Sequence, residues 1–198
     1  MDYAARWIHT LGAWDVGISY FNGTSRDPRF VPNTSVTALL PVYDLIEQWG
    51  VDLQATLGNW LWKAEAINRS GQGRTYSALT GGFEYTYYGI MKSPSDLGVI
   101  AEAMYDDRGD DAPTPFANDF MLGARLTLND EQSTEFLVGM IFDNNNSSRL
   151  INLESSRRFG SNWKVNLEGR AFINIPKNDP LYGARNDDYL QLEIVRYY

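Results

Sequence analysis

The stretch Trp163-Lys164-Val165-Asn166-Leu167-Glu168-Gly169-Arg170-Ala171 decides the fold class of this chain. Its odd-numbered positions carry Trp, Val, Leu, Gly and Ala, while its even-numbered positions carry Lys, Asn, Glu and Arg. Because successive side chains of a β-strand point to opposite faces, a strand here has one apolar face and one charged face. The C-terminal segment repeats the pattern, since Leu190, Leu192 and Ile194 alternate with Gln191 and Glu193.

The same alternation extends along the whole chain and predicts about eleven strands, with little sign of helical periodicity. The connections after the odd-numbered strands are short, whereas those after the even-numbered strands are mostly longer and more polar. The segment from Ser35 to Val42 is a candidate extension of the third strand. Short turns at one end and long loops at the other are typical of an all-β, antiparallel, up-and-down transmembrane barrel. The expected strands lie near 3–11, 14–22, 45–57, 60–69, 76–89, 97–106, 119–128, 134–143, 149–158, 163–174 and 188–198.

The composition excludes several classes of protein. The 198 residues include no cysteine and only one histidine, His9. A disulfide scaffold, a thiolate zinc site and a multi-histidine metal site are therefore excluded, and we expect no cofactor and no metal. The formal net charge of −8 argues against a nucleic-acid partner. No apolar run approaches the roughly 18 residues that a membrane helix needs.

Aromatic residues of the apolar parity gather at both ends of the expected strands, with aliphatic residues between them. Such rings prefer the headgroup level of a bilayer, so two aromatic girdles around an aliphatic belt indicate a membrane. The predicted girdle residues are Trp14, Trp60, Tyr87, Trp163 and Tyr198 at the short-turn end, and Tyr20, Tyr105, Phe120 and Phe142 at the long-loop end.

The opposite parity collects most of the charged residues within the strands. So many charges cannot all face a dry core, because a buried unpaired charge costs several kcal/mol. They can line a hydrated lumen, or pair with one another across a narrow one. The predicted lumen-lining residues are Arg6, Asp52, Lys63, Glu65, Glu84, Glu102, Arg125, Glu135, Glu154, Arg158, Lys164, Glu168, Arg170 and Glu193.

The odd strand count bears on domain organisation. Bacterial single-chain barrels have an even number of strands, and the sequence shows no secretory signal peptide. We therefore expect residues 1–198 to form one barrel domain that lacks its signal peptide and one or more N-terminal strands. Fusion of two strands within the range from Asn33 to Leu57 is the alternative, giving about twelve strands in this chain.

The C-terminal run Asp187-Asp188-Tyr189-Leu190-Gln191-Leu192-Glu193-Ile194-Val195-Arg196-Tyr197-Tyr198 resembles the terminal strand of Gram-negative outer-membrane proteins. Tyr198 stands where Phe is commoner, and Arg196 replaces the usual apolar residue. More broadly, the chain resembles the C-terminal portion of a group of uncharacterised, porin-like proteobacterial outer-membrane proteins. The segments that carry this second resemblance are 21–28, 105–116, 119–128 and 179–182.

This resemblance implies the bacterial outer membrane as the location. It also implies outer-membrane lipid and lipopolysaccharide as surroundings, and the barrel-assembly machinery as a partner that reads the C-terminal strand. It implies no activity, and the sequence leaves the oligomeric state open.

Two features invite other readings of function. Some outer-membrane barrels are hydrolases with a Ser-His-acid arrangement of residues. His9, however, is a single histidine near the short-turn end, and it lies in no recognisable motif of this kind. We therefore expect no enzyme activity. The acidic loop 106–111 lacks EF-hand spacing, so we interpret it as a solvated loop, with weak divalent-cation binding, bridging to lipopolysaccharide phosphates, as the alternative.

These observations predict a porin-like barrel that lets small hydrophilic solutes diffuse passively. One alternative is a structural or adhesive barrel with a closed lumen, and another is a soluble carbohydrate-binding β-protein whose aromatic rings stack on sugars. The mixed signs of the lumen charges favour weak selectivity, because an anion-selective pore would show a one-sided basic ring.

Overall fold

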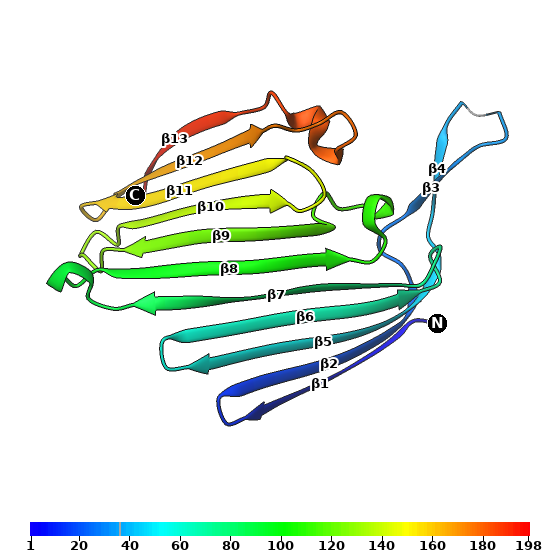
Figure 1. The fold of residues 1–198 in the computed structure, drawn as a ribbon, viewed down its shortest axis with the longest axis horizontal. Helices are drawn as coiled ribbons and strands as arrows, with labels where there is room; N and C mark the ends of the chain where they lie inside the picture. Colours follow the sequence, from blue (N-terminus) through cyan, green and yellow to red (C-terminus); the bar gives the residue numbers. More distant parts are fainter. Residues whose placement is uncertain (36) are drawn as a thin grey trace.

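The computed structural model describes residues 1–35 and 37–198, and within these residues the chain is all-β. Thirteen strands form in the described residues (Figure 1). Three short 3₁₀ turns, η1 (Ile90–Lys92), η2 (Gly109–Asp111) and η3 (Pro180–Ala184), interrupt the connections. The strands are β1 (Tyr3–Leu11), β2 (Trp14–Thr24), β3 (Arg29–Pro32), β4 (Leu39–Val42), β5 (Leu45–Leu57), β6 (Trp60–Ser70), β7 (Tyr76–Tyr87), β8 (Asp96–Asp106), β9 (Asn118–Thr127), β10 (Glu135–Asp143), β11 (Arg149–Phe159), β12 (Trp163–Ile173) and β13 (Tyr189–Arg196).

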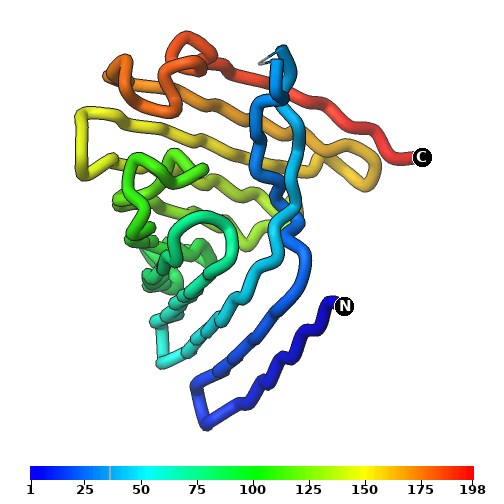
Figure 2. Tube along the Cα trace, turned by 90° about the vertical axis from the view of Figure 1, so that its right-hand side faces the viewer, coloured from blue at the N-terminus to red at the C-terminus, as the bar shows by residue number. Residues whose placement is uncertain are grey.

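Eleven of these strands make one antiparallel sheet, in the order β1-β2-β5-β6-β7-β8-β9-β10-β11-β12-β13. Each strand pairs with the one that precedes it in this order, so the sheet is a continuous meander apart from the hairpin inserted between β2 and β5. Figure 2 shows that the sheet curves strongly and that β1 and β13 lie at its two open edges. These edge strands do not pair with each other, so the sheet is open in this structure.

The eleven strands of the sheet coincide with the eleven predicted ones, and no boundary differs by more than two residues, as at Thr24 and Tyr87. The prediction for Ser35 to Val42 is wrong: Leu39–Val42 pairs with Arg29–Pro32 in a separate two-stranded hairpin and does not extend β5. Val36, within that predicted extension, lies outside the described residues. Figure 1 shows this hairpin projecting from the end of the sheet.

The turns β1–β2, β5–β6, β7–β8, β9–β10 and β11–β12 lie at one end, called the turn end, and the other connections lie at the opposite end, called the loop end (Figure 1). The predicted difference in length holds only in part, because the turn-end connections 88–95 and 128–134 are longer than the loop-end connections 71–75 and 144–148. Gly12 and Gly58 adopt φ of 64° and 62°, which lets the two shortest turns reverse the chain without a Cβ clash. No helix in the described residues is long and apolar enough to cross a membrane.

The sheet is a single layer, because the main contacts between strands are all between sheet neighbours. Its accessible surface is 13103 Å², whereas a compact monomer of 22.5 kDa exposes about 9,500 Å². Many large apolar side chains are among the exposed residues: Trp49 is 52% exposed, Leu122 45% and Val138 46%. The fold therefore leaves an apolar surface uncovered that other folds bury against a second layer.

Candidate functional site

The strand registers place the predicted lumen-lining residues on one face of the sheet. Directly paired residues of an antiparallel sheet point to the same side. One such row runs through Asp52, Glu65, Thr80, Met104 and Asp119. Following the registers across all the strands puts the fourteen predicted charged residues on this side. Two hollows that open on this side are lined across neighbouring strands, and we call it the concave face.

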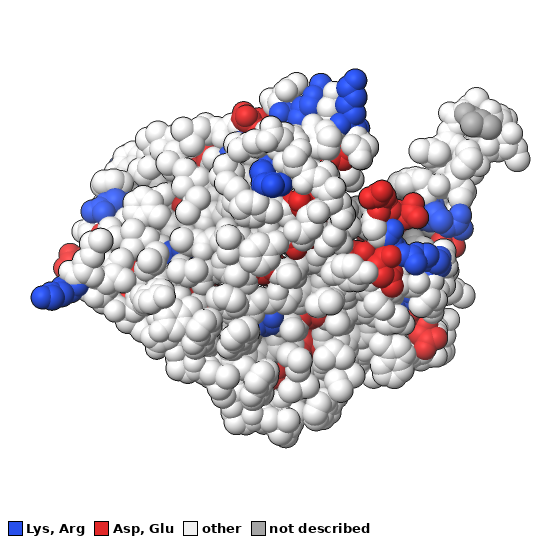
Figure 3. Space-filling view, in the orientation of Figure 1, with Lys and Arg blue, Asp and Glu red and all other residues white. Residues whose placement is uncertain are grey.

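The opposite, convex face carries the predicted aromatic and aliphatic residues. One row crosses nine strands and contains no charge. Eight of the nine predicted girdle residues lie on this face by register, and the ninth, Tyr198, lies beyond the end of β13. Figure 3 shows few charged residues over the strands of the face in view and charges gathered at the two ends. The uncharged row is Trp14, Ala55, Trp62, Phe83, Ala101, Leu122, Met140, Ile151 and Ala171.

The convex aromatics form clusters that extend the predicted girdles. At the turn end, Trp60 stacks on Trp62 with 5.4 Å between ring centroids, and Tyr85 meets Trp60 edge-on at 4.6 Å. At the loop end, the rings of Tyr20 and Trp49 lie 4.6 Å apart. Trp49 and Trp62 were not among the predicted girdle residues, although their parity matches that of Val51 and Ala64.

Two ion pairs on the concave face reach across a whole strand. Arg6 on β1 lies 2.9 Å from Asp52 on β5, and Arg125 on β9 lies 3.2 Å from Glu84 on β7. In both cases the strand between them carries a glycine beneath the carboxylate.

A Cβ added to Gly17 would lie 2.3 Å from Oδ2 of Asp52, and one added to Gly98 would lie 2.6 Å from Oε1 of Glu84. The glycines therefore create the space through which these carboxylates cross. Both pairs run along the wall of the sheet, because their partners are two strands apart.

Carboxylates also lie directly opposite each other on this face. Glu154 pairs in register with Glu168, and Asp52 with Glu65. Sheets ordinarily avoid such like-charge neighbours, because their repulsion destabilises the pairing. Next to Glu154 and Glu168 is a hollow of about 400 Å³. Its charged lining consists of Arg125, Glu135, Glu154, Lys164, Glu168 and Glu193.

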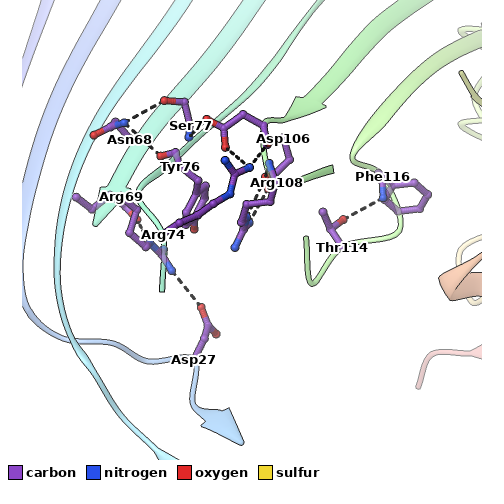
Figure 4. Close-up of polar contacts among 12 residues, drawn as sticks. Asp27, Asn68, Arg69, Arg74, Tyr76, Ser77, Asp106, Arg108, Thr114 and Phe116 are labelled. Atoms are coloured by element: carbon purple, nitrogen blue, oxygen red, sulfur yellow. Dashed lines mark hydrogen bonds and ion pairs between the residues drawn. The ribbon is translucent and has the colours of Figure 1, made fainter. Parts of the chain in front are cut away.

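The loop end of the concave face carries arginines that are each bound to an aspartate (Figure 4). Arg108 pairs with Asp106 at 2.5 Å, and its guanidinium carbon lies 3.5 Å from the centroid of the Tyr76 ring. Arg74 pairs with Asp107 at 3.4 Å. The Arg74–Asp107 pair is a feature that the spacing of the residues did not predict, because the two residues are far apart in sequence.

The alternative interpretation of the acidic loop 106–111, weak cation binding, gains no support from this geometry. Asp106 and Asp107 already bind arginines, and Asp107 also accepts a hydrogen bond from the backbone N–H of Ser77 at 3.0 Å. Among the described residues, no three metal-ligating side chains are grouped so as to hold an ion. His9 stacks on Trp7 at 5.5 Å and lies opposite Val16 on the convex face.

A second polar network joins the loops at this end. Asp179 accepts hydrogen bonds from Ser148 at 2.5 Å and from the side-chain amide of Asn146 at 3.1 Å. Asn146 also donates to Asp143 at 2.7 Å. The loop 144–148 between β10 and β11 is thereby tied to the connection before β13, which fixes the shape of the loop end.

The turn between β9 and β10 holds a carboxylate whose ionisation supports the fold. Asp130 accepts hydrogen bonds from the backbone N–H and the hydroxyl of buried Thr134, both at 2.8 Å, and lies 3.2 Å from Arg157. The hydrogen bond from the backbone N–H of Thr134 is the main reason that the pKa of Asp130 lies below its usual range. The Thr134 hydroxyl and the positive charge of Arg157 lower this pKa further.

A lowered pKa in the folded state means that this carboxylate adds stability above its unfolded pKa, about 3.9. The contribution is lost as the pH falls through the folded value. We expect Asp130→Asn to lower the urea midpoint at pH 7, and the difference from the wild type to shrink as the pH drops below about 4. Asp111→Asn, at an exposed loop position, is the control and should leave the midpoint unchanged at both pH values. A gap that persists unchanged at pH 3 would contradict the role of Asp130.

The site thus consists of a curved, single-layer wall with a charged concave face, a polar rim at the loop end and an apolar convex face. Such a wall can hold water and ions on one side and hydrocarbon on the other. Comparison with protein-family models, with curated proteins and with solved structures found nothing that matches this chain.

Proposed function

We propose that the chain forms the wall of an outer-membrane β-barrel that lets small hydrophilic solutes diffuse passively. The observation that carries this proposal is that the two faces of one sheet differ. The convex face is exposed and apolar, with aromatic residues near both the turn end and the loop end, and the concave face is charged. An apolar surface of this size needs hydrocarbon around it, and charges of both signs need water. The proposal places lipid and lipopolysaccharide against the convex face, and it includes insertion by the barrel-assembly machinery through β13.

Closure of the proposed barrel is constrained by strand direction. Because the eleven strands alternate in direction, β1 and β13 run the same way, and direct pairing between them would be parallel. An all-antiparallel barrel instead needs an odd number of further strands between these two edges. The even strand number of bacterial barrels favours this second closure, with the further strand or strands supplied from outside residues 1–198.

An open lumen is supported by the course of the ion pairs. Both Arg6–Asp52 and Arg125–Glu84 join strands two apart in the sheet, so they lie along the wall and leave the interior free. A closed structural or adhesive barrel would instead be held by pairs across the lumen. The alternative of a soluble carbohydrate-binding β-protein is not supported, because no second sheet covers the convex face in the described residues.

The test combines folding and conductance. The chain is refolded in detergent together with the strand or strands that close the barrel, and this closed form is the refolded chain of every test below. It should migrate differently on SDS gels with and without boiling, and should give discrete conductance steps in a planar bilayer. Neutralising the wall pair, Arg125→Gln with Glu84→Gln, should change the step size by at least about 20%, because both groups face the lumen. The matched control, Arg29→Gln with Asp44→Asn, removes an ion pair at the base of the hairpin, outside the wall, and should leave the step unchanged.

Either of two results would overturn the proposal. A chain that remains folded and soluble without any detergent has no need of a membrane. A heat-modifiable chain that never conducts would favour the structural barrel with a closed lumen.

A further inference from the structure

The charges of the concave face are sorted by height along the strands. Seven charged residues lie at or within about one residue of the middle of their strands, and six of them are acidic. Arg6 is the exception, and it is paired with Asp52. The six acidic residues at mid-height, which we call the carboxylate belt, are Asp52, Glu65, Glu102, Glu154, Glu168 and Glu193.

Four of the six basic residues predicted to line the lumen lie closer to the turn end, whereas Arg6 lies at mid-height and Arg170 is the fourth residue from the loop end of β12. Lys63 is the fourth residue from that end of β6, and Arg125 is the third from that end of β9. Arg158 and Lys164 each lie one residue inside the turn end of their strands and pair directly in register. The turn end also carries Asp15, Glu84 and Glu135 on this face. A path along the concave face from the loop end therefore meets paired charges first, then the carboxylate belt, and then charges of both signs.

The carboxylates of the belt are incompletely compensated. Within the part of the chain that the structure describes, Glu65, Glu102 and Glu154 form no ion pair with Lys or Arg. Glu168 accepts a hydrogen bond from the hydroxyl of Tyr189, which is neutral. The like-charge registers Asp52–Glu65 and Glu154–Glu168 concentrate this negative charge on neighbouring strands.

We propose that the conduit favours cations over anions, with the carboxylate belt setting the preference. This inference rests on the proposed function. Walls of low dielectric focus the field of uncompensated charges into the lumen and raise the local concentration of counter-ions there.

The experiment measures the reversal potential of the refolded chain in a tenfold KCl gradient across a planar bilayer. The wild type should show a K⁺ to Cl⁻ permeability ratio of about three or more at 0.1 M salt. Raising the mean ionic strength to 1 M should bring the ratio towards one, because the Debye length falls from about 10 Å to about 3 Å. This salt series needs no variant and is unaffected by any folding defect.

The belt variant replaces Glu65, Glu102, Glu154 and Glu168 by Gln and should lower the ratio at least about twofold. The matched control is Asp110→Asn, Asp111→Asn, Glu131→Gln and Asp187→Asn, which removes the same number of acidic charges at exposed positions in loops and a turn. Each variant is used only in the heat-modifiable, folded form.

The outcomes separate the two proposals. Discrete conductance with a ratio of one, or with a preference for Cl⁻, overturns the cation preference and leaves passive diffusion standing. Equal effects of the belt and control variants would assign the preference to overall charge and not to the belt. A folded chain with no conductance at all would overturn the proposed function and the inference together.

Discussion

Leu122→Arg should prevent the chain from reaching a folded, heat-modifiable state in lipid or detergent, whereas Met121→Arg should not. Leu122 lies at mid-length of β9 on the convex face and is 45% exposed. In the proposed barrel this position faces the middle of the bilayer, where an arginine costs about 2–4 kcal/mol. That penalty is a large part of the 5–15 kcal/mol that holds most folded domains together.

The neighbouring substitution is the matched control, because it adds the same side chain one residue away. Met121 points to the concave face and pairs directly with Glu102, so an arginine there gains an opposite charge. Both variants are compared by the fraction that shifts on SDS gels after boiling and by the urea midpoint in detergent. If the two variants lose folding equally, the assignment of convex face to lipid is wrong.

The sheet could be predicted from sequence because the residues within each strand are sufficient to identify it. Alternation such as Trp163 to Ala171 identifies a strand and both of its faces without reference to any other strand. The hairpin of β3 and β4 was not predicted, because it lacks this local alternation. Its strands have four residues each, which is too few for alternation to show, and Pro32 and Pro41 argue against a strand where they stand.

The face of each charged residue was predictable, but its neighbours were not. Parity assigns Glu154 and Glu168 to the concave face, yet only the register between β11 and β12 shows that they lie opposite each other. Register depends on turn geometry and on contacts between strands, which single-strand patterns do not contain. The glycines beneath Asp52 and Glu84, and the arginine–aspartate pairs of the loop end, belong to this same class of information.

A second large effect is expected from a methyl group placed between two strands. Gly82 lies in β7 opposite Glu102 of β8, and a Cβ at this position would lie 2.2 Å from the carbonyl oxygen of Ala101 and 2.8 Å from the Cα of Glu102. Both atoms belong to the backbone, so no side-chain rotation relieves the clash. Gly82→Ala should therefore push β7 and β8 apart and destabilise the sheet by about 3 kcal/mol or more.

Gly81→Ala tests whether this loss comes from the close approach of the strands or from any change at a glycine. A Cβ on Gly81 would have its nearest neighbours at 3.7 and 3.8 Å, which are ordinary contacts. Since glycine weakens a strand interior by roughly 0.5–1 kcal/mol relative to alanine, Gly81→Ala should raise the urea midpoint slightly while Gly82→Ala lowers it sharply. Two neighbouring Gly→Ala changes of opposite sign can arise only if β7 and β8 are in the register described. Equal midpoints for the two variants would instead mean that the backbones of these strands are farther apart at Gly82.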